Sequence, residues 1–252
     1  MSVDAEKKAA SKGGNWETLR VVIHALILAL IVRVFLFQPF NIPSGSMIPT
    51  LLIGDYLFVS KYTYGYSRYS FPFGFDFFSG RIWAAEPERG DVVVFKLPRD
   101  NATDYIKRVV GLPGDEVQMI NGELHLNGEP VDRVKVDDYV APGIGGRDRR
   151  FTRYMETLPN GVSYPVLDLV NGGVGDNTDV YKVPEGHFFM MGDNRDNSTD
   201  SRFLSEVGFV PFENLVGKAR VIFFSIDEDA SFWQVWRWPS DVRWNRIFKT
   251  VE

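Results

Sequence analysis

The 252-residue sequence contains no cysteine and only three histidines. Without cysteine the chain cannot form a disulfide, use a thiolate nucleophile or build a cysteine-ligated zinc site. The three histidines, His24, His125 and His187, lie far apart in the sequence, so they give little support for a histidine-based metal site. These absences leave oxygen and nitrogen side chains to carry any chemistry.

The sequence also lacks a basic stripe. Its 28 Lys and Arg residues and 33 Asp and Glu residues are mixed along the chain and give a formal net charge of −5. Binding to a phosphate backbone requires clustered positive charge, so nucleic acid is not expected as a partner. The hydrophobic content of 44% is typical of a packed protein, and the length suits one substantial domain plus a smaller part.

Long hydrophobic runs are missing except for one, VVIHALILALIVRVFLF at 21–37. The run is just long enough to span a bilayer, and Arg33 can extend its charge to the interface. A cleaved signal peptide and a buried soluble helix are the alternatives. Because no small-residue cleavage pattern follows and basic residues precede the run, we expect an anchor at 20–38, with 1–19 in the cytoplasm.

Beyond the anchor the pattern predicts a β-rich domain. Short apolar or alternating runs at 55–61, 91–97, 105–111 and 220–226 are separated by turn residues, and no long amphipathic helix is evident. The polar, glycine-rich composition between about 130 and 183 predicts an inserted subdomain of exposed loops rather than core.

Two aromatic segments stand apart from this pattern. The stretch 64–83 is rich in Tyr and Phe, and either packs against its own loop or dips into the bilayer interface. The Trp-rich segment 232–244 is either a membrane-facing patch or a packed terminus. The sequence does not decide either case.

Ser46 is the sharpest candidate for a nucleophile. Gly45 permits an unusual backbone conformation, while Pro43 and Pro49 restrict the loop on both sides. A rigid loop holds a hydroxyl and a backbone N–H together without an ordering cost during the reaction. The alternative is a plain stiff turn where the chain leaves the membrane.

A Ser-His-Asp arrangement would be the usual base scheme, but the histidines stand in the anchor or in turn-rich contexts. A buried lysine can replace histidine, because burial lowers the amine pKa towards neutrality. Lys107, in YIKRVVGLPGD, is placed for this role, and strand alternation puts it on the face of Tyr105 and Val109, with Arg108 opposite. The alternative is a lysine that points to water.

A third polar cluster, MGDNRDNSTDSR, occupies 191–202. Its Asp and Asn residues are also compatible with a calcium loop, but the glycine and distal glutamate of an EF-hand are not at the required offsets. We expect instead that Asp and Arg pair to fix a loop beside a site, with Ser198 orienting a neighbouring group.

Taken together, these segments resemble the bacterial type I signal peptidases. Four pieces match in the family's order: IPSGSMIPTL at 42–51, RGDVVVFKLP at 89–98, YIKRVVGLPGD at 105–115 and GDNRDNSTDSR at 192–202. Four such matches after an amino-terminal anchor are highly specific. The resemblance implies a mainly β fold, in which one transmembrane helix precedes an antiparallel catalytic domain with an inserted β subdomain.

The resemblance also implies roles for individual residues. Ser46 would be the nucleophile, Lys107 the general base, and the Ser44 hydroxyl with the Ser46 N–H the oxyanion hole. Ser198 would orient the lysine amine, supported by an ion pair of Asp200 with Arg202. The shallow pockets for small substrate side chains would be formed by Phe40, Ile42, Pro43, Met47, Leu51 and Ile106.

By this resemblance the chain removes signal peptides from exported preproteins at the bacterial inner membrane, without metal or cofactor. Its partners are those preproteins and the lipid bilayer. The catalytic domain, 39–228, lies outside the cytoplasm, with the inserted subdomain at about 116–185 and a tail at 229–252. Some relatives have a second span or a disulfide in the insertion, and this chain has neither. Two alternative hypotheses for the function are a specialised processing peptidase and a catalytically idle scaffold.

Overall fold

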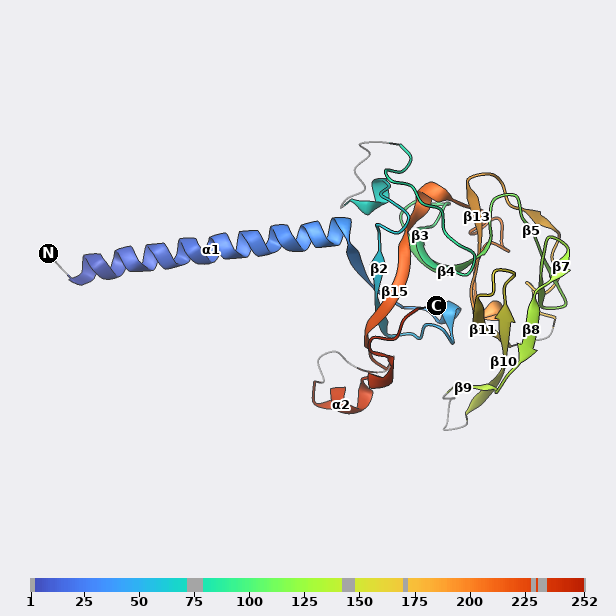
Figure 1. Cartoon of the computed structure of the whole chain (residues 1–252). Coiled ribbons are helices and arrows are strands. Elements are labelled where there is room, and N and C mark those ends of the chain that lie inside the picture. Colours follow the sequence, from blue (N-terminus) through green and yellow to red (C-terminus); the bar gives the residue numbers. More distant parts are fainter. Residues whose placement is uncertain are drawn as a thin grey trace.

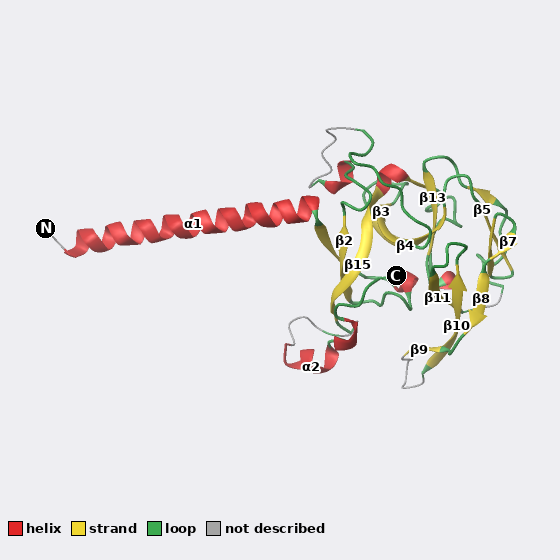
Figure 2. Cartoon of the chain, viewed as in Figure 1, coloured by secondary structure: helices red, strands yellow, loops and turns green. Residues whose placement is uncertain are grey.

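The computed structural model describes residues 3–71, 79–141, 148–169, 172–227, 230 and 235–251, with side chains described from residue 16 onwards, except that of residue 235. A single long helix, α1, projects from a β-rich body (Figure 1). Strands dominate that body, and the remaining helical pieces are short (Figure 2). The mainly β fold class expected from the sequence is confirmed.

Helix α1 runs from Val3 to Phe35. Within it, Trp16–Phe35 has a mean hydropathy of 2.2 and is 6% buried, so it is long and apolar enough to cross a membrane. The helix ends three residues before the expected end of the anchor at 38, because Phe37–Asn41 forms strand β1 instead. Pro39 cannot donate a helical hydrogen bond, and its place in an edge strand suits that limitation.

The main sheet has the strand order β1-β2-β15-β3-β4-β13-β14, and every adjacent pair is antiparallel. Its remaining strands are β2 (Asp55–Ser60), β3 (Val92–Lys96), β4 (Asp104–Gly111), β13 (His187–Met191), β14 (Val210–Pro211) and β15 (Leu215–Ser225). The four strands expected from the sequence correspond to β2, β3, β4 and β15.

Two smaller sheets form the region between β4 and β13. One has the order β11-β10-β8 with β9 joined to β10, and the other has the order β12-β5-β6-β7. The strands are β5 (Glu116–Ile120), β6 (Glu123–Leu126), β7 (Glu129–Pro130), β8 (Asp132–Lys135), β9 (Tyr139–Ala141), β10 (Arg149–Thr157), β11 (Ser163–Asp168) and β12 (Tyr181–Lys182).

The expectation that the segment 130–183 lacks a core is wrong. Leu158, Tyr164 and Val166 are each no more than 1% exposed and pack in one cluster with apolar side chains of β5, β6 and β13. The glycine-rich composition hid this core, because the apolar positions alternate with polar ones along strands that each bury one face.

The beginning of the aromatic stretch packs against the end of α1. The Tyr66 hydroxyl donates to the Phe35 carbonyl at 2.8 Å, and the two rings lie 5.7 Å apart. Trp83, at the other end of the stretch, is 80% exposed. The part between, 72–78, lies outside the described residues.

The carboxy-terminal tail is packed in part and also carries exposed tryptophans. Arg246 is buried against Asp55, with Nε 3.0 Å from Oδ1, and it also donates to the Thr50 carbonyl at 3.0 Å. Trp236 and Trp244 are 73% and 64% exposed. Residues 231–234 of the tail lie outside the described part.

Candidate active site

Ser46 lies in a short 3-10 turn, η1 (Gly45–Met47), that directly follows strand β1 and its extension. The turn is closed by a 3.2 Å hydrogen bond from Ile48 N to the Gly45 carbonyl, and Ser46 is only 6% exposed. The Ser44 hydroxyl lies 3.5 Å from the Ser46 hydroxyl. The stiff, proline-flanked loop expected from the sequence therefore places two serine hydroxyls side by side.

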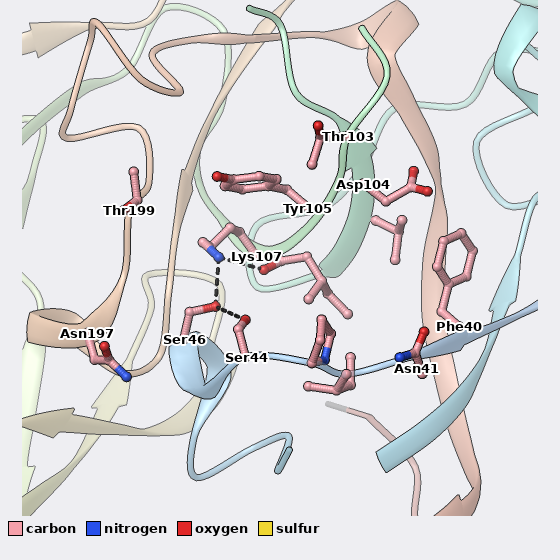
Figure 3. Close-up of a pocket in the computed structure, with 14 residues that line it drawn as sticks. Phe40, Asn41, Ser44, Ser46, Thr103, Asp104, Tyr105, Lys107, Asn197 and Thr199 are labelled. Carbon is pink, nitrogen blue, oxygen red and sulfur yellow. Dashed lines mark hydrogen bonds between the residues drawn. The ribbon is translucent and has the colours of Figure 1, made fainter. Parts of the chain in front are cut away.

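Lys107 extends from β4 to this turn (Figure 3). Its Nζ donates to Ser46 Oγ at 2.8 Å and to the Ile106 carbonyl at 3.1 Å. The ammonium position is 5.2 Å from the centre of the Tyr105 ring, which confirms that Lys107 and Tyr105 share a face. Lys107 is 4% exposed, so the alternative of a lysine pointing to water is wrong.

The electrostatic environment of Lys107 favours a neutral amine. The Lys107 pKa is lowered from 10.5 to about 8, mainly by burial; Asp200 and Asp193 oppose this shift, and Arg202 adds to it. Both hydrogen-bond acceptors of Nζ are uncharged oxygens. At mildly alkaline pH a large fraction of the amine can therefore hold a lone pair next to the Ser46 hydroxyl.

Asn194 holds the serine turn in place, and the sequence reasoning did not single it out. Its backbone N donates to the Ser46 carbonyl at 3.1 Å, and its Nδ2 donates to the Gly45 carbonyl at 3.0 Å. The signal was present, because Asn194 belongs to the polar cluster at 191–202. However, the order of residues in this cluster does not show which polar side chain faces the serine turn.

The expected ion pair in that cluster is present. Arg202 Nε and Nη2 contact the two carboxylate oxygens of Asp200 at 2.8 and 2.9 Å, and Gly192 N donates to Asp200 at 3.0 Å. Burial alone would raise the Asp200 pKa, but the Arg202 charge and these hydrogen bonds hold that pKa below its ordinary value. The pair is therefore charged and fixes the loop.

Ser198 is buried beside the same loop. Its hydroxyl helps to lower the Asp200 pKa, and in the described part of the chain no hydrogen bond joins it to Lys107. The backbone at Gly192 passes very close to Ser198 and to the serine turn. A Cβ added at Gly192 would lie 2.3 Å from Ser198 Oγ and 2.6 Å from the Ser46 carbonyl oxygen. Only glycine fits at this point. The structure thus brings Ser198 to the serine turn without joining it to Lys107.

A second set of buried charges lies behind the site. Arg108 contacts both carboxylate oxygens of Asp193 at 2.9 and 2.8 Å, and Thr50 donates to the same carboxylate. Arg195 forms a bidentate ion pair with Glu156 of β10. Arginines thus supply the positive partners of these carboxylates, as expected from the sequence.

A cleft of about 490 Å³ opens in front of the Ser46–Lys107 pair. The predicted pocket residues Phe40, Ile42, Pro43 and Ile106 line it, together with Ser44, Ser46 and Lys107. Met47 and Leu51 are fully buried and pack with Ile42 in the core beneath the cleft. Asp104, Asn197 and Thr199 line the cleft and were not expected from the sequence.

Two strand edges border this cleft. Strand β1 pairs with β2 on one side only, and β13 pairs with β4 only from Arg108 to Gly111. The segments Phe40–Ser44 and Asp104–Lys107 both line the cleft. An extended peptide placed between them could hydrogen-bond to strand backbone, as in strand addition to a sheet.

The described part of the chain contains one group of three neighbouring carboxylates, and none of its members lines the cleft. Asp168, Asp176 and Asp196 place one oxygen each within 4.8 Å of the others. Arg133 contacts Asp168 at 3.2 Å, and backbone N–H groups donate to Asp176 and Asp196. These donors offset the negative charge only in part, because burial and the neighbouring Asp196 and Asp176 raise the Asp168 pKa above its ordinary value.

A family model described as signal peptidase, peptidase S26, matches residues 15–224. The chain belongs to this family. Signal peptidase I of Rickettsia conorii is 42% identical over 272 residues, covering 100% of this chain and 98% of the relative. Signal peptidase I of Rickettsia typhi is 43% identical over 244 residues, covering 90% of each chain.

Among solved structures, a signal peptidase I from Enterococcus faecalis covers 53% of this chain and 97% of its own, with 26% identity and a TM-score of 0.31. As a member of the peptidase S26 family, the chain is a serine endopeptidase. The resemblance identified from four short segments is therefore confirmed over nearly the full length.

Proposed function

We propose that this chain is a membrane-bound signal peptidase I that cuts exported preproteins after small residues, with Ser46 as nucleophile and Lys107 as general base. The observation that carries the proposal is the 2.8 Å contact between Lys107 Nζ and Ser46 Oγ. It joins a buried amine of lowered pKa to a hydroxyl that lines a cleft of about 490 Å³.

The reaction follows from this geometry. Neutral Lys107 takes the Ser46 proton as Oγ attacks the scissile carbonyl, and the Ser44 hydroxyl and Ser46 N–H stabilise the oxyanion. The protonated amine then gives its proton to the leaving nitrogen, which releases the new amino terminus. Water, deprotonated by the same lysine, hydrolyses the ester on Ser46 and restores the enzyme.

Neighbouring residues would hold Ser46 and Lys107 in contact. Asn194 holds the two carbonyls of the serine turn, and the Asp200–Arg202 pair fixes the loop that carries Ser198. We assign Ser198 to orient the lysine amine. Its burial beside the serine turn supports this assignment, because a Cβ at Gly192 would contact both the Ser198 hydroxyl and the Ser46 carbonyl oxygen.

The cleft would bind the substrate as an extended strand between the edges of β1 and β4. Phe40, Ile42, Pro43 and Ile106 form its apolar wall, with Met47 and Leu51 supporting that wall from the core. Shallow pockets of this kind accept alanine-sized side chains and reject large ones by steric overlap.

The helix α1 would anchor the enzyme with residues 1–19 in the cytoplasm and the domain 39–228 on the other side. The apolar window ends at Phe35 and β1 begins at Phe37, so the cleft starts close to the membrane surface. A signal peptide that spans the bilayer would present its cleavage junction at this height. The bilayer and the preprotein are thus the expected partners.

The test is processing of an exported precursor by the full-length protein in detergent or vesicles. We expect Ser46→Ala and Lys107→Ala each to reduce the rate by at least about 10³-fold, since each removes a group used in every step. Circular dichroism should show both variants folded. Ser205→Ala, an exposed serine outside the cleft, is the matched control and should cleave normally.

Normal processing by Ser46→Ala or Lys107→Ala would overturn the proposed mechanism. Depletion of the protein in cells separates a general enzyme from a specialised one. Accumulation of many precursors supports the general activity, whereas accumulation of one or two would point to a narrow processing peptidase.

A further inference from the structure

The two ends of the cleft are lined by different residues. Figure 3 shows Asn197 and Thr199 at one end, the Ser44, Ser46 and Lys107 group near the middle, and Phe40, Asn41 and Asp104 at the other end. Phe40 belongs to β1, which follows α1 almost directly. The end that contains Phe40 and Asp104 is therefore the end that faces the membrane helix.

A substrate of the proposed activity would enter from that end. The apolar segment of a signal peptide precedes the scissile bond and comes from the bilayer, so the residues before the cut would run from Phe40 and Asp104 towards Ser46. Asp104 is three residues before Lys107 on β4, a separation of about 10 Å along an extended strand. It would thus lie beside a substrate residue roughly three to five positions before the cut.

Asp104 is chemically distinct from the rest of this wall. It and Lys107 are the two charged residues among those that line the cleft in the described part of the chain. The other lining residues at this end are apolar or carry neutral polar groups, such as Phe40, Asn41 and Thr103. A substrate side chain passing here therefore meets one carboxylate.

The carboxylate is held but not neutralised on the cleft side. Lys96 Nζ contacts Asp104 Oδ1 at 2.9 Å and the Ala102 carbonyl at 2.7 Å, which ties the lysine to the turn before β4. Lys96 is not among the cleft-lining residues, and the Asp104 side chain remains 38% exposed. The pair is partly screened by water, so its influence on a substrate is modest.

We propose that Asp104 is a specificity-determining residue, which favours a basic side chain and disfavours an acidic one at the substrate position beside it. This inference rests on the proposed function, because it assumes that the substrate occupies the cleft in the direction given above. It adds a charge preference at the membrane end of the cleft to the size selection at the small pockets near the cut.

The test uses precursor peptides that carry Lys, Ala or Asp at the fourth position before the scissile bond, with a second series substituted at the fifth. For the wild-type enzyme we expect kcat/KM in the order Lys, Ala, Asp, with about fivefold between the extremes at low salt. Asp104→Asn should reduce this ratio to near one. Lys96→Met should increase it, because the carboxylate then loses the cation that contacts it, and only the charge interaction with buried Lys61 remains.

Glu129→Gln is the matched control. It removes one exposed negative charge from β7, in a different sheet, and should leave the wild-type ratio unchanged. Cleavage of all peptides at rates independent of charge would overturn the inference, as would an unchanged ratio in Asp104→Asn. Failure of the wild-type enzyme to cut any peptide of either series would instead contradict the proposed function.

Discussion

The two sides of strand β4 carry neighbouring basic residues with opposite electrostatic behaviour. Lys107 and Arg108 are 4% and 0% exposed. Burial lowers the Lys107 pKa to about 8. For Arg108 burial acts in the same direction, but the adjacent Asp193 outweighs it and raises the pKa above its ordinary value.

The difference lies in what each side chain contacts. Arg108 faces both carboxylate oxygens of Asp193, donates to the Gly90 carbonyl at 2.7 Å and lies 4.1 Å over the Tyr164 ring. Lys107 donates to a hydroxyl and one carbonyl. Burial with a carboxylate thus keeps one cation charged, whereas burial beside neutral oxygens produces a base.

Arg108 and Lys107 therefore have different roles. Arg108 connects β4 to the loop that carries Asp193 and Asn194, and through Tyr164 to strand β11 of the inserted region. It holds the surroundings of the site in place. In the proposed mechanism Lys107 is the general base, and its low pKa depends on the scaffold that excludes water from it.

Removing the Arg108 side chain should give the largest effect on stability. Arg108→Met leaves Asp193 buried without its cation, and we expect the free energy of unfolding to fall by about 3–5 kcal/mol. Chemical denaturation of the full chain in detergent measures this. The double variant Arg108→Met/Asp193→Leu, which removes both charges, should recover much of the loss. A single variant as stable as wild type would contradict the assigned role.

Much of this arrangement was predictable from the sequence, and the missing part has a physical cause. Alternation in YIKRVVG placed Lys107 and Arg108 on opposite faces, and GDNRDNSTDSR indicated ion pairing. Which aspartate each arginine meets depends on how β4 and the 191–202 loop pack, which no local pattern encodes. The burial of Lys107 depends on the same packing.

The limits of local pattern also appear at the cleft. Met47 and Leu51 follow Ser46 closely in sequence, yet they lie in the core. Asp104 lines the cleft because β13 leaves this part of β4 unpaired, and that is a property of sheet order. Strands were predictable from alternation, whereas their neighbours were not.

The pH dependence of cleavage directly tests whether Lys107 is the general base. Because the base must be neutral, kcat/KM should rise with pH and reach half its maximum near the Lys107 pKa of about 8. Below that midpoint the rate should fall about tenfold per pH unit. Circular dichroism over the same range checks that the protein stays folded. A rate that stays level down to pH 6 would show that the base is not this amine.

The smallest effect expected is a gain in stability when the base is removed. The Lys107 pKa is 10.5 as a free side chain and about 8 when folded, so between these values the unfolded state binds more protons and wild-type stability rises with pH. Below pH 8 the full cost of burying the charge is present. Lys107→Met, similar in shape, should therefore raise the free energy of unfolding at pH 7 by about 1–3 kcal/mol.

That gain should shrink between pH 8 and 10.5, where the wild-type amine is neutral in the folded state and still charged in the unfolded state. Denaturation of wild type and Lys107→Met at pH 7 and pH 10 measures the difference. If the variant is less stable than wild type at pH 7, as expected for Arg108→Met, then Lys107 is a paired structural cation as well. In that case the contrast between the two faces of β4 would not hold.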